Sequence, residues 1–119
     1  MLTPLELDIM KAIWRRPQAT VRYVQSEIRP ARKLAYTTVM TIMNRMYQKG
    51  LLTRSLRGRA HLYQPTVGYD EVRDSELARL TQNFFAGSRD NLMRFLGGEE
   101  SEMPRAPQQS ARELDESLL

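Results

Sequence analysis

The side chains best suited to chemistry in this 119-residue chain form a run of small polar groups between residues 37 and 45. Hydroxyl groups, an amide, a thioether and a guanidinium can all enter a DNA major groove, where they reach base edges or thymine methyl groups. We therefore predict a base-reading surface made of Thr37, Thr38, Met40, Thr41, Asn44 and Arg45. The alternative is a helix whose threonines simply face solvent.

Few residues of the chain are suited to catalysis or to metal binding. There is no cysteine and a single histidine, His61, which excludes disulfides, thiolate metal sites and cysteine catalysis. No pair of carboxylates stands at a useful spacing from a nucleophile or from His61, because the acids gather in the second half of the chain. The sequence therefore predicts neither an enzyme nor a bound cofactor or metal.

Basic side chains gather in the first half of the chain. The net charge of +4 divides into +9 for residues 1–64, with twelve Lys or Arg against three acids, and −5 for residues 65–119. Fifteen of the eighteen basic residues are Arg, whose guanidinium suits bidentate contacts to phosphate and guanine. We expect the first half to bind a polyanion. The candidate contacts are Arg32 and Lys33 in a turn and Arg54, Arg57 and Arg59 on a predicted hairpin wing.

Capping signals mark the first two helices. Thr3-Pro4-Leu5-Glu6 is a capping box with a proline at the first helical position, and Pro17 ends this helix near residues 15–16. Thr20 is a favourable N-cap for a second, short helix that ends before Pro30. Both segments repeat apolar residues at helical spacing, which indicates one buried face on each helix.

A third helix is predicted from about residue 36 to residue 49, with Gly50 as its C-terminal stop. Ala35 is a poor N-cap, so Thr37 is an alternative cap. The buried stripe of this helix is expected to consist of Val39, Ile42, Met43 and Met46. That stripe leaves the polar run of residues 37–45 on the opposite face.

Beyond Gly50 the apolar residues alternate, which predicts a β-hairpin with the basic tip Arg57-Gly58-Arg59. Two helices are expected next, one over about residues 69–86 and one capped by Ser88. Residues 99–110 are polar and typical of a linker, and a capping box at residues 110–113 indicates a short terminal helix.

The order helix, link, helix, basic turn, helix, hairpin is that of a winged helix-turn-helix. The expected fold is therefore mainly α with a small β-hairpin wing. Residues 1–66 would form the winged helix-turn-helix, residues 67–98 a C-terminal helical region, and residues 99–119 the linker with its short helix. We expect a cytoplasmic protein, because no export signal is visible and the longest uncharged stretch, residues 34–44, is too short to span a bilayer.

The most specific motifs between Leu5 and Tyr63 are Ala-Tyr-Thr-Thr-Val-Met-Thr at residues 35–41 and Gly-Arg-Ala-His-Leu-Tyr-Gln-Pro at residues 58–65. With these motifs, the stretch resembles the penicillinase-repressor family (BlaI/MecI/CopY type) of bacterial transcriptional regulators. Residues 7–14, 19–22 and 49–51 add to the resemblance. A looser likeness continues through residues 84–87 and 92–95.

This resemblance implies a homodimeric repressor whose winged helix reads one half of a dyad-symmetric operator in double-stranded DNA. By position, it implies base contacts from Thr37, Thr38, Met40 and Thr41. It also implies that the C-terminal helices join the two protomers. The apolar residues expected at that surface are Val72, Leu77, Leu80, Phe84, Leu92, Phe95 and Leu96.

Three features of the chain depart from the family pattern. Copper-responsive members carry a C-terminal cysteine cluster, and the absence of cysteine excludes that route of copper sensing here. β-Lactam-responsive members are released when a signal-dependent protease cuts before a Phe, typically after Asn, whereas the matching pair here is Arg94–Phe95. Pro104 and Pro107 interrupt a region that is usually helical in relatives.

Two function classes remain for the whole chain. The first is a dimeric, sequence-specific transcriptional repressor. The alternative is a winged-helix interaction module whose basic face docks an acidic protein partner. The repressor predicts discrimination between DNA sequences, and the interaction module predicts only a steep salt dependence.

Overall fold

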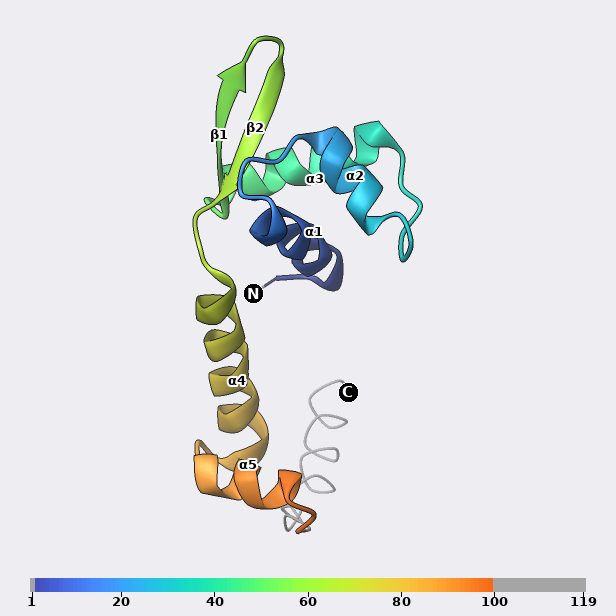
Figure 1. Cartoon of the computed structure of the whole chain (residues 1–119). Coiled ribbons are helices and arrows are strands. Elements are labelled where there is room, and N and C mark those ends of the chain that lie inside the picture. Colours follow the sequence, from blue (N-terminus) through green and yellow to red (C-terminus); the bar gives the residue numbers. More distant parts are fainter. Residues whose placement is uncertain (1, 100–119) are drawn as a thin grey trace, which may run out of the picture. The chain divides into compact units, whose positions relative to one another are not determined.

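The computed structural model describes residues 2–99, and its elements follow the predicted order (Figure 1). Three helices come first: α1 (Pro4–Arg15), α2 (Val21–Ile28) and α3 (Tyr36–Gln48). The hairpin, which we call the wing, consists of β1 (Leu52–Arg57) and β2 (Ala60–Pro65), and α4 (Tyr69–Phe85) and α5 (Arg89–Leu96) follow. The prediction of a mainly helical fold with a small β-hairpin wing is confirmed.

The chain divides into two compact units, Met1–Leu77 and Ala78–Leu119, and the division falls within α4. The boundary predicted at residue 66 lies ahead of that helix. The linker and short terminal helix expected over residues 99–119 fall outside the described residues, except for Glu99. Within residues 2–99, no helix is long and apolar enough to cross a membrane.

Side-chain caps begin the first two helices, as the capping signals predict. Thr3 Oγ1 accepts a hydrogen bond from the Glu6 N–H at 3.1 Å, and Glu6 Oε1 accepts one from the Thr3 N–H at 2.9 Å. Thr20 Oγ1 accepts from the Tyr23 N–H at 3.1 Å. These two local motifs set where α1 and α2 start.

The N-terminal end of α3 differs from the alternative prediction, in which Thr37 is the N-cap. The N-cap is Ala35, which makes no side-chain hydrogen bond. Its extended backbone brings its carbonyl oxygen to 3.1 Å from the Val39 N–H, so the helix begins directly after it, at Tyr36. The Thr37 cap is therefore wrong, and Thr37 lies inside the helix with its side chain exposed.

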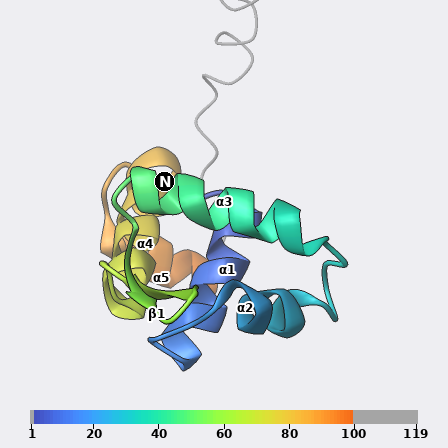
Figure 2. The same cartoon turned by 90° about the horizontal axis from the view of Figure 1, so that it is seen from above.

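The core of the first unit lies between α1, α2, α3 and the base of the wing, and Figure 2 shows the three helices around it. Its largest fully buried side chains are Ile9, Met10, Ile13, Val24, Val39, Met43, Met46, Leu52 and Tyr63. Ile42 is half-buried and packs against this cluster. The apolar stripe predicted for α3 thus faces the core.

The two strands of the wing pair antiparallel from Leu52↔Pro65 to Arg57↔Ala60, which leaves Gly58 and Arg59 as the tip. Gly58 has φ +62°, a conformation that glycine adopts without strain. The link before α2 joins the wing at its base, because the N–H of Ala19 donates to the Tyr63 carbonyl at 3.0 Å and the reverse bond measures 2.8 Å. In Figure 1 the wing projects away from the three helices.

The second unit holds the end of α4 and the whole of α5. The rings of Phe85 and Phe95 lie 5.6 Å apart, and Ser88 caps α5 by accepting from the Asn91 N–H at 3.1 Å. Among the described residues, every fully buried apolar side chain lies at or before Tyr63. The described part of this unit therefore has no buried apolar core of its own.

Candidate nucleic-acid interface

The run of polar residues predicted to read bases lies on the side of α3 that faces away from the core. Thr37, Thr38, Met40, Thr41 and Arg45 are exposed, whereas Asn44 is half-buried. The three fully buried positions of α3, Val39, Met43 and Met46, hold the opposite face in the core. The helix therefore presents one continuous face of small polar side chains and Met40.

The Thr41 hydroxyl has one of its hydrogen-bonding roles already filled. Its Oγ1 donates to the Thr37 carbonyl oxygen at 2.8 Å, so its proton is engaged inside the helix. The free lone pairs can accept from an exocyclic amine of adenine or cytosine, and the methyl group can touch thymine.

Two side-chain hydrogen bonds, together with the packing of Leu34 on the core, hold the basic turn between α2 and α3 to the rest of the first unit. Arg32 Nε donates to Asp8 Oδ2 at 2.8 Å, which joins the turn to α1. Gln25 Nε2 donates to the Leu34 carbonyl at 3.0 Å. Arg32 thus already has a carboxylate partner, and Lys33 is the exposed cation of this turn.

The three arginines predicted on the wing have different surroundings. Arg57, the last residue of β1, and Arg59 in the tip are both exposed. Arg54 is half-buried: its Nη1 donates to Asn44 Oδ1 at 2.8 Å, and its Cζ lies 4.2 Å from the centroid of the Tyr47 ring. The structure therefore brings Arg54 to α3 and leaves the tip arginines available to a ligand.

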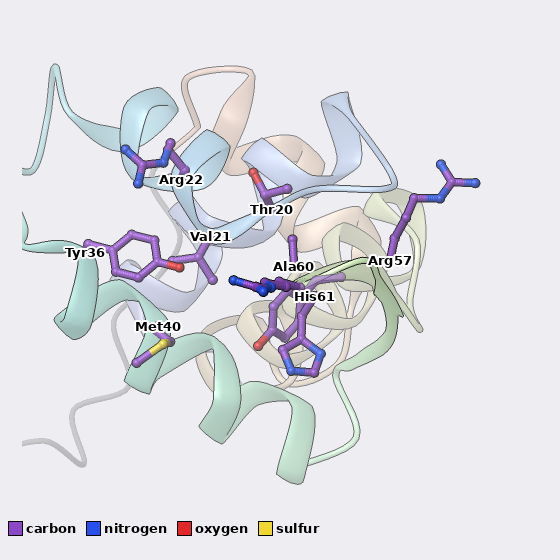
Figure 3. A pocket seen from close by; sticks show the side chains of 10 residues that line it. Thr20, Val21, Arg22, Tyr36, Met40, Arg57, Ala60 and His61 are labelled. Carbon is purple, nitrogen blue, oxygen red and sulfur yellow. The ribbon is translucent and has the colours of Figure 1, made fainter.

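A groove of about 560 Å³ runs between α2, α3 and the wing (Figure 3). It is lined by Thr20, Val21, Arg22, Tyr36, Met40, Arg57, Arg59, Ala60, His61 and Tyr63. Figure 3 shows Tyr36 and Met40 coming from α3, Arg22 from α2 and His61 from the wing, while Arg57 reaches outward from the other labelled side chains. We call this the α3–wing groove. Its lining combines apolar side chains with the cations Arg22, Arg57 and Arg59.

Arg22 and Tyr36 are absent from the residues predicted to bind DNA. The Arg22 Cζ lies 5.7 Å from the centroid of the Tyr36 ring, and both side chains line the α3–wing groove. The sequence could have indicated an exposed position for Arg22, because this residue follows the Thr20 cap on a helix whose other face is apolar. For Tyr36 the signal was its place one residue ahead of the threonine run.

The segment that forms this face carries charges of one sign in its own sequence, and two of its cations, Arg32 and Lys49, pair with Asp8 and Glu6 of α1. Residues 28–69, which include the whole of α3 and the wing, contain eight Lys or Arg and no Asp or Glu. Such a surface attracts polyanions through the summed field of its cations. Across residues 2–99, no cluster of three or more His, Cys, Asp or Glu residues is arranged to hold a metal ion.

The apolar residues predicted for a dimer surface are exposed or half-buried on α4 and α5. Phe84 is 72% exposed and Leu96 69% exposed, and Met93, which the prediction left out, is 67% exposed. Leu77, Leu80 and Phe95 are also exposed, whereas Val72 and Leu92 are half-buried. Arg94 lies next to Phe95 near the end of α5. The described residues of α4 and α5 thus leave much apolar surface uncovered.

Comparison with known families shows to which family the chain belongs. The family model described as penicillinase repressor matches residues 2–118. The chain belongs to the penicillinase repressor family. The resemblance found in the sequence is therefore confirmed, and it extends over almost the whole chain.

Individual members of the penicillinase repressor family show how far the likeness reaches. The transcriptional regulator BlaI of Mycobacterium tuberculosis is 42% identical over 72 residues, which cover 60% of this chain and 52% of the relative. The chain thus spans about half the length of that curated relative. The penicillinase repressor of Bacillus licheniformis is 22% identical over 92 residues, covering 77% of this chain and 72% of the relative.

Solved structures of the family support the winged-helix fold. The DNA-binding domain of the repressor BlaI aligns with a TM-score of 0.53 at 25% identity, covering 60% of this chain and 87% of that domain. The monomeric form of Bacillus licheniformis BlaI, solved in complex with the blaP half-operator, aligns with a TM-score of 0.51 at 25% identity and the same coverage. The winged helix-turn-helix predicted from the element order is confirmed.

Proposed function

We propose that this chain is a transcriptional repressor that binds a dyad-symmetric DNA operator as a homodimer. The observation that carries the proposal is the polar face of α3, which lies within a stretch of eight cations and no acid. The family membership and the likeness to a BlaI domain solved on its half-operator support it. Such a repressor would act in the cytoplasm, where bacterial DNA lies.

The geometry of the first unit suits a duplex. With α3 in the major groove, Thr37, Thr38, Met40 and Thr41 reach base edges, and Arg45 reaches a base or a phosphate. The wing then lies over the neighbouring minor groove or backbone, where Arg57 and Arg59 neutralise phosphates.

In this arrangement, the DNA strand that lies between those two contacts occupies the α3–wing groove. A sugar–phosphate backbone separates every major groove from the adjacent minor groove. A duplex that holds α3 in one groove and the wing at the next must therefore pass a strand between them. Arg22 beside Tyr36, together with Arg59, supplies cations for its phosphates, and Met40 and Val21 supply apolar contact for its sugars.

The second unit makes the protein a dimer in this proposal. Its described part has no buried apolar core, while Phe84, Met93 and Leu96 are each more than 60% exposed. A second copy of the chain would cover these side chains by symmetry. It would also set the two α3 helices about 34 Å apart, the spacing of successive major grooves on one side of DNA.

Release of the operator would follow from loss of the C-terminal part of the second unit. Cleavage between Arg94 and Phe95 would divide α5 and remove Phe95 from its contact with Phe85. The apolar surface that joins the protomers would shrink, and each half-site would be bound by a monomer alone. A signal-dependent protease is the partner that this part of the proposal requires.

The proposal is tested by fluorescence anisotropy with the full chain. An operator duplex is first selected from random DNA, and its affinity is compared with that of a scrambled duplex at several salt concentrations. We expect a preference of about 10³-fold or more for the selected duplex, as for other specific regulators.

Equal, salt-labile binding to every duplex would contradict the repressor. That result, combined with saturable binding of an acidic protein, would favour the interaction module. The salt series distinguishes the repressor from the interaction module, because binding driven by counterion release alone has no sequence preference.

A further inference from the structure

Arg54 differs from the other basic residues of the wing because its guanidinium contacts α3 in two ways, through a hydrogen bond and through an aromatic ring. Its Nη1 donates to Asn44 Oδ1 at 2.8 Å, and its guanidinium lies 4.2 Å from the centroid of the Tyr47 ring. Asn44 and Tyr47 are three residues apart on α3, so they are neighbours on one side of the helix. We call Arg54, Asn44 and Tyr47 the Arg54 cluster.

The register of the wing shows where this cluster acts. Leu52, Arg54 and Leu56 share one face of the hairpin, with Pro65, Tyr63 and His61 opposite them. Leu52 and Tyr63 are fully buried, so this face is turned to the core at its base. Leu56, the next position along β1 on that face, is 66% exposed. Arg54 therefore stands where the wing leaves the body of the first unit.

The chemistry of the cluster limits what Asn44 can do for DNA. A guanidinium has donors only, so Asn44 must present its carbonyl oxygen to Arg54. Reading adenine with asparagine uses that oxygen and the amide nitrogen together. Arg54 occupies one lone pair of that oxygen and fixes its direction, so Asn44 is oriented toward the wing and only the second lone pair remains for a base.

We propose that Arg54 is a positioning residue, which holds the wing to the recognition helix α3 through Asn44 and Tyr47 and does not serve as a phosphate ligand. This inference rests on the proposed function, because it assumes that α3 and the wing contact one duplex together. It differs from the sequence prediction, in which Arg54 and Asn44 each bind DNA. Arg57 and Arg59 keep that role.

The structural part of the proposal is tested without DNA. Hydrogen exchange of the wing amides, residues 53–63, is measured on the full chain and on Arg54→Lys, Asn44→Ala and Tyr47→Leu. Lysine keeps the charge, but an ammonium cannot lie flat on Tyr47 while donating to Asn44. We expect each variant to exchange about tenfold faster over the wing, with exchange in α1 unchanged. Arg57→Lys is the matched control for this DNA-free measurement, and its wing amides should exchange at the parent rate.

The DNA part is tested with the selected operator in a salt series. If Arg54 positions the wing, Arg54→Lys and Asn44→Ala each weaken binding about tenfold, and the double variant is no weaker than either single one. The slope of log affinity against log salt then stays that of the parent. Arg57→Gln, in contrast, should lower that slope by about one.

Two results would overturn the proposal. The first is a wing whose exchange does not respond to Asn44→Ala or Tyr47→Leu. The second is an Arg54→Lys variant with the affinity of the parent, combined with an Arg54→Gln variant that loses one unit of salt slope, as a phosphate ligand would. A parent chain that shows no preferred duplex contradicts the proposed function, and the exchange measurements still decide the role of Arg54.

Discussion

Glu6 is the only carboxylate among the described residues that is buried, and its surroundings favour the charged form. Burial by itself would raise the pKa of Glu6, but the hydrogen bond from the Thr3 N–H and the ion pair with Lys49 Nζ at 3.0 Å outweigh it and lower the pKa. Lys49 is 59% exposed, so solvent screens part of that ion pair. The carboxylate joins the cap of α1 to the end of α3.

We expect Glu6→Gln to lower the free energy of unfolding by about 1 kcal/mol at pH 7. Because the folded-state pKa lies below the unfolded one, the stabilisation is complete above the unfolded pKa. It disappears as the pH falls through the folded pKa. Urea unfolding of parent and variant at steps from pH 7 to pH 2 should show the difference shrinking in acid. Glu27→Gln, at the exposed 3.5 Å ion pair with Arg15, is the control. A deficit independent of pH would contradict this account.

Thr38 is the residue whose role depends most directly on the proposed docking of α3. It is exposed on the polar face, one helical turn from Thr41. We expect Thr38→Ala to reduce discrimination between the operator and a single-base variant by roughly 1–3 kcal/mol, with little change in salt slope. Anisotropy with both duplexes measures this. Ser26→Ala, exposed on α2, is the control, and an unchanged ratio for Thr38→Ala would mean that Thr38 reads no base.

At the scale of the elements, the corner between α4 and α5 depends on two residues with positive φ, Ala86 at +51° and Gly87 at +77°. A Cβ on Gly87 would come within 3.0 Å of Gln82 Oε1. The left-handed backbone is costly for residues that carry a Cβ, by about 1–2 kcal/mol. The corner is therefore strained at Ala86 and relaxed at Gly87.

Opposite substitutions at these two positions should act in opposite directions. We expect Gly87→Ala to destabilise the corner by about 1–2 kcal/mol, whereas Ala86→Gly leaves its stability unchanged or raises it slightly. Hydrogen exchange of the α5 amides, residues 89–96, measures both effects. The same response to both changes would mean that backbone conformation is not what sets this corner.

At the scale of the whole molecule, the two units differ in how they are stabilised. The first has a core that its own helices and wing cover completely, as Ile9, Val24 and Met43 show. The described part of the second has none, and its stability then rests on short helices that are marginal in water without packing. In the proposed dimer, a second copy covers this apolar surface.

Phe84 and Leu96 provide the test of this surface. We expect Phe84→Ala and Leu96→Ala each to weaken self-association by at least about tenfold, because each removes roughly 1.5–3 kcal/mol of apolar burial. Sedimentation equilibrium over a concentration series measures it, with the exposed, polar Asn83→Ala on the same helix as control. Operator affinity should fall with the dimer, while the salt slope per monomer is kept. A chain that is monomeric before mutation would contradict the dimer.

The sequence by itself determined where most elements begin and end. Thr3, Thr20 and Ser88 act through hydrogen bonds to groups three residues away, and the wing turns at Gly58 within its own hairpin. Such interactions involve only neighbours in the chain, so they can be read without knowing the fold. The order of elements and the polar face of α3 followed from them, and with these the winged-helix class.

Only the tertiary structure decided which basic side chains have a polar partner within the chain. Arg32 and Arg54 look like Arg57 in the sequence, but Asp8 engages the first from 24 residues away and Asn44 engages the second from 10 residues away. Arg22 and Tyr36 come together at a groove that exists only once α2, α3 and the wing are packed. Side-chain partners of this kind are chosen by the packing of elements distant in the chain, and no local pattern encodes them.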